Sequence, residues 1–289
     1  MMRQRPLFSK ICTVVLTVAL VACAANPRSG PSDGVRVNDS AGLKNMVPAS
    51  QLEQTAARQY GDMKVAAGKK NALAPENSPE LIRLRSIAKQ ILPHASIWNP
   101  DAQNWKWEIN LFVSDEVNAF CMPGGKIAFY TGILQKLKLN DDEVAAVMGH
   151  EIAHALREHA RERIATSQVT SLGANILTQA LGLGNLGSQA LGQGLQLVSL
   201  SFSRADEKDA DLVGMDIAAR AGYDPRAGVS LWQKMGQLSQ DKDKQPEWLS
   251  THPSGDSRIY EIQRNMMDAL VLYARAKNTT IDRLPNYKP

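Results

Sequence analysis

His150-Glu151-Ile152-Ala153-His154 lies in the middle of a strongly helical stretch of this sequence. Two histidines four residues apart on a helix lie on nearly the same face, separated by about one turn and about 6 Å of rise. Both imidazoles can therefore reach one metal ion at the roughly 2.0–2.1 Å of a zinc–nitrogen bond. Glu151 is rotated by about 100° from His150, so it flanks the metal, where its carboxylate can take a proton from the attacking water. The pattern predicts a zinc hydrolase, and within that class a peptidase.

The helix around this motif is predicted to begin near Asn140. Asn140 and Glu143 have the spacing of a capping box, and Asp141 and Asp142 favour the positive end of the helix dipole. His159 comes nine residues after His150. On an unbroken helix it points about 180° away from the motif, so we expect a solvated surface histidine outside the site.

Two histidines do not complete a catalytic zinc site, which normally has three protein ligands and a water molecule. The metzincin pattern would supply a third histidine six residues after His154. Residue 160 is alanine, which excludes that class. A carboxylate is the remaining alternative, and the downstream segment 203–211 offers several.

A second helix is predicted after Ser203. Its apolar face is built mostly from small residues, which permit close approach to another helix: Ala210, Gly214, Ile217, Ala218 and Ala221. Glu207 and Asp211 lie four residues apart at the leading edge of this face. Two buried carboxylates are costly without partners, and zinc beside Glu207 with a metal-bound histidine beside Asp211 would remove that cost. The alternative is an ordinary charged helix start in solvent.

The remaining periodicities predict a small sheet among helices. Helices are expected at residues 51–67 and 79–92, and residues 105–113 alternate as a half-buried strand does. The runs 117–122 and 126–130, joined by the turn Pro123-Gly124-Gly125, predict a hairpin. The expected fold class is α+β and predominantly helical.

The first 22 residues have the form of a signal peptide. A basic start precedes the apolar run 11–21, which is too short for a comfortable transmembrane helix. The run ends in Leu20-Val21-Ala22-Cys23, which resembles the lipobox of bacterial lipoproteins. The resemblance implies cleavage before Cys23 and a diacylated thiol that anchors the chain without spanning the membrane. Ala24, rather than an aspartate, favours the periplasmic face of the outer membrane by resemblance to bacterial sorting rules. An ordinary secretory peptide with an incidental cysteine is the alternative.

Charge and cysteine content exclude several classes of protein. The formal charge of +4 falls to about +1 without residues 1–22, which carry three basic and no acidic residues. Nothing in this charge indicates nucleic-acid binding. Cys121 alone remains once Cys12 leaves with the signal and Cys23 is lipidated, so neither an internal disulfide nor a thiolate zinc site is expected.

Composition divides the mature chain into regions. Residues 23–50 are expected to form a lipidated flexible tether, residues 51–275 one globular domain, and residues 276–289 a surface tail. Within the domain, residues 166–202 are rich in Leu, Gly, Ala, Gln and Ser and almost uncharged. Two interpretations stay open for this segment: a low-complexity connector, or an amphipathic lid or membrane-touching segment beside the active site.

The motifs together resemble those of the gluzincin peptidases of the HtpX and CAAX prenyl protease type. The matching elements, over roughly residues 79–265, are Asn118-Ala119-Phe120 with Pro123-Gly124-Gly125, His150-Glu151-Ile152-Ala153-His154, and Glu207-Lys208-Asp209-Ala210-Asp211. The lipobox is most similar to the periplasmic outer-membrane lipoproteins of the BepA-like and LoiP-like branch. No 34-residue helical repeat follows the catalytic region, so the tetratricopeptide-containing members are less similar.

The resemblance implies a zincin-like metalloprotease whose small sheet binds an extended peptide along its edge strand, Asn118 to Met122. It also implies one Zn2+ per chain. The implied metal ligands are His150, His154 and Glu207, the catalytic base is Glu151, and the residue that orients a ligand is Asp211.

His252-Pro253, followed by Arg258, matches the late His-Pro element of that family. His252 is the leading candidate to stabilise the oxyanion, and occupation of the open coordination position is the second role left open. A loop histidine beside a turn-forming proline is the alternative. Arg258 either anchors this loop through a carboxylate or is solvated.

The predicted function is that of a membrane-tethered periplasmic zinc endopeptidase. The resemblance implies misfolded or stalled outer-membrane and envelope proteins as substrates, and the outer-membrane assembly machinery as a further partner. One rival is an assembly factor whose proteolysis is absent or repressed, which the intact Glu151 disfavours because a purely structural zinc needs no base. A weaker rival is an amidase acting on cell-wall peptides.

Overall fold

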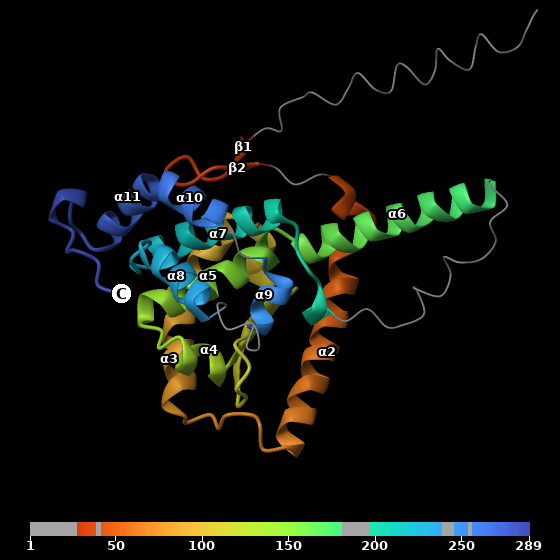
Figure 1. Ribbon diagram of the computed structural model, residues 1–289, viewed down its shortest axis with the longest axis horizontal. Coiled ribbons are helices and arrows are strands. Elements are labelled where there is room, and N and C mark those ends of the chain that lie inside the picture. Colours follow the sequence, from red (N-terminus) through yellow and green to blue (C-terminus); the bar gives the residue numbers. More distant parts are fainter. Residues whose placement is uncertain (1–27, 39–41, 181–196, 239–245, 254–255) are drawn as a thin grey trace, which may run out of the picture.

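The computed structural model describes residues 28–38, 42–180, 197–238, 246–253 and 256–289. Helices make up most of the described chain, and a small sheet lies between α3 (Pro79–Ile91) and α2 (Ala49–Lys69) (Figure 1). This arrangement confirms the predicted α+β, predominantly helical fold class. No helix among the described residues is long and apolar enough to cross a membrane.

The three-stranded sheet contains β3 (Glu108–Phe112), β4 (Ala119–Met122) and β5 (Lys126–Tyr130), in the order β3-β5-β4. β4 and β5 are antiparallel, and β3 runs parallel to β5. Gly124 and Gly125, with φ of +77° and +79°, make the turn between β4 and β5. The predicted hairpin is confirmed, and β4 is an edge strand.

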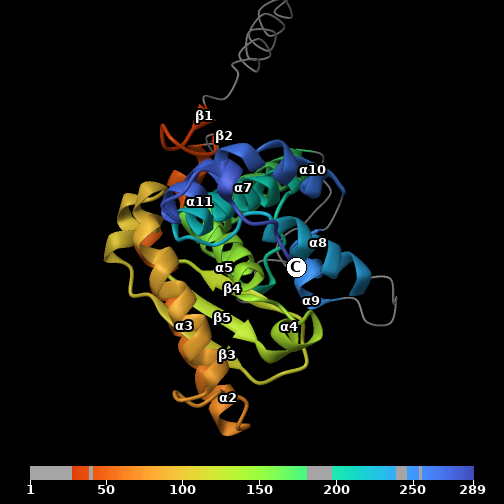
Figure 2. The ribbon, with the colours of Figure 1, turned by 90° about the vertical axis from the view of Figure 1, so that its left-hand side faces the viewer.

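Both faces of the sheet are covered (Figure 2). Side chains of α3 pack with Leu111 and Phe129 in the main core, whereas α2 packs over Phe112 and Phe120 on the opposite face. The prediction of a half-buried strand over residues 105–113 is therefore wrong, because α2, which lies far away in sequence, covers the face that was expected to meet solvent. The strand itself begins at Glu108.

The helix with the two histidines is α5 (Asp141–Leu156), and its capping box of Asn140 and Glu143 is present as predicted. It crosses α7 (Arg204–Arg220), which begins with a second capping box, Ser203 and Asp206. A Cβ on Gly214 would lie 2.6 Å from the carbonyl carbon of Gly149. Because neither position carries a side chain, the helix backbones touch, which confirms the close approach predicted from the small-residue face of α7.

The helix does not continue through His159. α5 ends at Leu156, Glu158 adopts a left-handed φ of +60°, and a new helix, α6 (His159–Ala180), starts in another direction. His159 is consequently 2 % exposed and lies against His154. The prediction of a solvated histidine is wrong because it assumed one unbroken helix.

Part of the predicted tether is packed on the domain. β1 (Arg28–Ser29) pairs with β2 (Val37–Asn38), and Val35 is fully buried. The backbone N–H of Val35 donates to the buried carboxylate of Asp216 on α7 at 3.2 Å. The segment Arg28–Asn38 therefore belongs to the folded body.

The other described α-helices complete the main core, and the C-terminal segment returns to it. The Tyr287 hydroxyl lies 3.0 Å from the Ser230 hydroxyl. The helices are α4 (Thr131–Lys136), α8 (Ala227–Leu238), α9 (Glu247–Thr251), α10 (Asp256–Arg264) and α11 (Met266–Ala276).

Candidate metal centre

Four side chains with metal-binding atoms converge between α5, α7 and the end of α9. One such atom from each of His150, His154, Glu207 and His252 lies within 4.8 Å of the other three, and all four residues are buried. α5 contributes both histidines from one face, α7 contributes the glutamate from its first turn, and His252 follows α9 directly. The structure thus brings together all three predicted ligands and His252.

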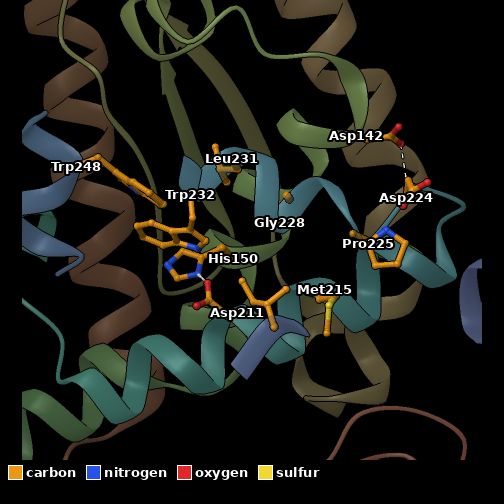
Figure 3. Close-up of a pocket in the computed structure, with 13 residues that line it drawn as sticks. Asp142, His150, Asp211, Met215, Asp224, Pro225, Gly228, Leu231, Trp232 and Trp248 are labelled. Atoms are coloured by element: carbon orange, nitrogen blue, oxygen red, sulfur yellow. Dashed lines mark hydrogen bonds and ion pairs between the residues drawn. The ribbon is translucent and has the colours of Figure 1, made fainter. Parts of the chain in front are cut away.

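Hydrogen bonds determine which nitrogen of His150 faces the others. Its Nδ1 lies 3.0 Å from Oδ1 of Asp211. A carboxylate only accepts, so Nδ1 carries the hydrogen and Nε2 presents its lone pair. Asp211 lies where it was predicted to orient a ligand (Figure 3).

The donor set suits a zinc ion. Nε2 of His150 lies 3.1 Å from Nε2 of His154, and the Glu207 carboxylate oxygens lie 3.6 Å and 3.4 Å from these two atoms. Two imidazoles and one carboxylate are the ligand types of catalytic zinc peptidases. A bound cation would offset the repulsion between the imidazole lone pairs and the buried carboxylate. These residues form a buried site consistent with one zinc ion per chain.

The protonation states also suit a cation. Burial lowers the pKa of His154 well below its ordinary value, despite the opposing effect of Glu207. Burial alone would raise the pKa of Glu207, but its contacts with the rings of His154 and His252 outweigh that effect and hold the pKa far below its usual range. The site therefore combines a neutral imidazole with an ionised carboxylate.

Arg258 on α10 supports the two α7 carboxylates. Its guanidinium donates to Asp211 at 2.6 Å from both Nε and Nη2 and also contacts Glu207. Burial alone would raise the pKa of Asp211, but Arg258 and His150 outweigh it, so the pKa is lowered. The guanidinium also lies 3.8 Å from the centroid of the Trp232 ring. Of the two readings of Arg258, the anchoring one agrees with its 3 % exposure.

Glu151 is 2 % exposed and lines the same cavity as His154 and His252. The indole N–H of Trp248, on α9, donates to its Oε1 at 2.6 Å. His252 approaches the same carboxylate, with Nε2 at 3.6 Å from Oε1. In this structure α9 and the residue after it thus contact both the predicted base and the ligand cluster.

His252 lies among the ligands. Its Nδ1 is 3.0 Å from Oε1 of Glu207 and 3.3 Å from Nε2 of His150. Burial alone would lower the pKa of His252, but the carboxylates of Glu151 and Glu207 outweigh it, so the pKa is raised. The placement beside both the ligand atoms and the predicted base fits either of the two roles left open for this residue.

Three cavities among the described residues are lined by a predicted metal ligand, and the one beside Trp105 and Arg161 reaches only His154. The two others reach more of the centre. One runs behind His150 past Trp232 and Trp248 to Asp142 and Asp224 (Figure 3). The other lies between the edge strand β4 and the segment Leu197–Phe202, and Glu151, His154 and His252 form its floor. The Phe202 ring stacks on His154 with centroids 4.0 Å apart. The segment Leu197–Phe202 therefore borders the cavity between the sheet edge and the centre.

Sequence reasoning missed two residues of this neighbourhood. Trp248 contacts the predicted base, but nothing local marks a tryptophan in a short helix as a partner of a glutamate 97 positions away. His159 was excluded by helical geometry, and only a break after Leu156 would have restored it. The acidic cluster on α7 contained one useful signal, since Asp209 in that cluster contacts His159 at 3.1 Å.

The comparison with protein families identifies residues 82–266 as a match to "Peptidase family M48". Mitochondrial metalloendopeptidase OMA1 of Schizosaccharomyces pombe is 32% identical over 214 residues, 74% of this chain and 58% of the relative. The OMA1 of Arabidopsis thaliana is 37% identical over 169 residues, 58% of this chain and 33% of the relative. The beta-barrel assembly-enhancing protease of Escherichia coli (strain K12) is 28% identical over 212 residues, 68% of this chain and 41% of the relative.

The chain spans about a third to three fifths of the length of these relatives. The family match covers more than half of this chain, and it includes both metal-binding helices. The prediction of the family is confirmed: the chain belongs to peptidase family M48.

Proposed function

We propose that this protein is a zinc endopeptidase in which His150, His154 and Glu207 hold the metal and Glu151 acts as the base. The observation that carries the proposal is the buried Glu151 carboxylate beside three converging ligand atoms. A site that held zinc for structure alone would need no such carboxylate.

When bound, zinc would polarise the scissile carbonyl and acidify the attacking water. Glu151 takes the proton of that water and later passes it to the leaving amine. Asp211 keeps His150 in the tautomer that ligates, and Arg258 holds Asp211 in place. The extended substrate pairs along β4, whose outer edge borders the cavity above Glu151.

The structure described here suits a closed state of the enzyme. His252 takes a place among the ligands, and the described end of the 166–202 segment, Leu197–Phe202, lies along the edge strand. We favour the lid interpretation for this part of the segment, because a peptide paired with β4 would need the same space. Opening would have to move Phe202 and His252. The backbone N–H of Phe202 donates to the carbonyl of Thr251, the residue before His252, at 3.2 Å.

For the biological role we propose quality control of misfolded or stalled envelope proteins, from the periplasmic face of the outer membrane. Support comes from the lipobox-like segment at Cys23, which lies outside the described residues, and from similarity to a relative named for β-barrel assembly. Other relatives carry mitochondrial names, so the location rests on the N-terminal segment rather than on the family.

The proposed function is tested by Glu151→Gln. This variant keeps the shape of the side chain, so we expect zinc content to stay at one per chain while hydrolysis of an unfolded protein falls by about 10²- to 10⁴-fold. Glu80→Gln, an exposed change in the first turn of α3, is the control and should hydrolyse at the wild-type rate. Wild-type activity in Glu151→Gln would remove Glu151 as the base.

The same variant separates the rival functions. Glu151→Gln should trap uncleaved substrates in the cell envelope, and the purified wild-type enzyme should then cleave the trapped proteins. Captured proteins that the wild type leaves intact would favour the assembly factor, and cleavage of muropeptides alone would favour the cell-wall amidase.

A further inference from the structure

Asp209 and His159 are connected to the metal centre by a series of side-chain contacts that ends at His154, although neither residue belongs to the ligand cluster. Nδ1 of His159 lies 3.0 Å from Nδ1 of His154, and Nε2 of His159 lies 3.1 Å from Oδ2 of Asp209. His159 is 2 % exposed, and the Asp209 side chain is 14 % exposed. The three residues form a chain from a carboxylate on α7, through the first residue of α6, to a predicted ligand on α5.

The Asp209 carboxylate, at the outer end of this chain of contacts, determines which atoms donate and which accept along it. The Asp209 carboxylate only accepts, so Nε2 of His159 carries a hydrogen. A neutral His159 then presents a lone pair at Nδ1, and Nδ1 of His154 must supply the hydrogen between the two rings. Nε2 of His154, which faces Nε2 of His150 at 3.1 Å, is left with its lone pair.

A histidine is an ambiguous partner for another histidine, because either ring can donate. The carboxylate removes this ambiguity, and Arg157 fixes the carboxylate: its Nε–H donates to Oδ2 of Asp209 at 2.7 Å. Oδ1 of Asp209 is buried and has no hydrogen-bond partner among the described residues. The direction of the chain is therefore fixed by the two contacts at Oδ2, from Arg157 and from His159.

We propose that Asp209 and His159 act as positioning residues that hold His154 in the tautomer with Nε2 free to bind zinc. This inference rests on the proposed function, and it gives His154 a counterpart to the Asp211 contact of His150. His154, whose Nδ1 faces an imidazole rather than a carboxylate, is thereby oriented through His159. Such outer contacts commonly contribute about 10- to 100-fold to metal affinity.

The first test uses the metal-free wild-type protein. Long-range 1H–15N NMR spectra should show the hydrogen of His154 on Nδ1 and that of His159 on Nε2. A His154 with its hydrogen on Nε2 would overturn the inference without any variant.

The second test measures zinc affinity by competition with a chromophoric chelator. His159→Phe keeps a ring beside His154 and Phe202 but removes the acceptor, and its dissociation constant for zinc should rise about 10- to 100-fold. His159→Asn places a carbonyl oxygen near the former Nδ1 and should recover most of the affinity. His94→Phe, a change at the half-buried histidine before the sheet, is the control and should bind zinc as the wild type does.

Asp209→Asn provides a variant that keeps the size of the side chain. Its amide can donate to His159, which would reverse the relay and move the hydrogen of His154 to Nε2. We expect weaker zinc binding and an altered absorption spectrum of the cobalt-substituted protein, changes that a purely structural role would not produce. If His159→Phe folds and binds zinc with wild-type affinity, the inference fails while the proposed function stands. A wild-type protein that binds no zinc would defeat both.

Discussion

Glu207 is the residue on which the metal assignment turns. It is fully buried, and its carboxylate faces both α5 histidines and His252. Glu207→Ala should weaken zinc binding by more than the roughly 10- to 100-fold expected for a residue that only orients a ligand. Isothermal titration with zinc measures this. Unaltered zinc content in the purified variant would remove Glu207 as a ligand, and Glu247→Ala, a change at the start of α9, is the control.

His252 can be assigned to one of its two roles by a single substitution. If it occupies a coordination position, as its 3.3 Å separation from Nε2 of His150 favours, His252→Ala should raise the rate of hydrolysis of an unfolded protein. The comparison requires that the variant still bind zinc. We expect that it does, because His150, His154 and Glu207 are still present. A fall of about 10²- to 10³-fold with zinc retained would instead identify His252 as the donor to the oxyanion.

At the scale of elements, the crossing of α5 and α7 places the ligands. A Cβ at Gly214 would lie 2.6 Å from the backbone nitrogen of His150, so the helices would have to separate. Gly214→Ala should lower the free energy of unfolding by about 1–3 kcal/mol and weaken zinc binding, because Glu207 would move away from His150. Chemical denaturation and chelator competition measure the two effects.

Gly61→Ala is the matched control for this crossing. Its added Cβ meets nothing within 4 Å on α2, so the free energy of unfolding should rise by about 0.5–1 kcal/mol, with zinc binding unchanged. Equal destabilisation by both changes would show that the loss at Gly214 is a general helix effect rather than a clash at the crossing.

The sequence predicted the elements whose signals are local. The Asn140–Glu143 cap, the α7 face around Gly214 and the turn at Gly124 each depend on residues within a turn or two, and all three are present. The break at Glu158 was missed because nothing in the residues around it forbids a continuing helix. Glu158, which has a positive φ, is held by a contact with a residue distant in sequence: its side chain forms a 3.1 Å ion pair with Lys44.

In the candidate site too, the sequence identified the residues that have a local signal and missed those placed by tertiary packing. His150, Glu151 and His154 could be found from helical spacing, and Glu207 and Asp211 from the cost of burying two carboxylates. Trp248 could not be found, because its contact with Glu151 depends on where α9 packs. The convergence of α5, α7 and α9 is a property of the tertiary structure and has no signature in any one of them.

At the scale of the whole molecule, the N-terminal segment is attached to the helix that carries Glu207. Asp33 pairs with Arg220 at the end of α7 and with Arg275 on α11, and these contacts lower the pKa of its carboxyl to about 2. Four residues lie between Cys23 and Arg28, where the packed segment begins. The five steps from one Cα to the next span at most about 18 Å at full extension. A lipid on Cys23 would therefore hold the α7–α11 end of the domain close to the membrane.

The lipid anchor is testable in cells. Cys23→Ser removes the thiol that the lipobox resemblance marks for acylation, so the protein should lose incorporation of labelled fatty acid and move from the membrane to the soluble fraction. Cys12→Ala, a change in the apolar run before the cleavage site, leaves Cys23 in place and should stay with the membrane. If the Cys23→Ser protein remains in the membrane pellet after a high-pH wash, an acylated Cys23 is not the anchor. In that case the proximity of the α7–α11 end to the membrane would have to come from the protein surface itself.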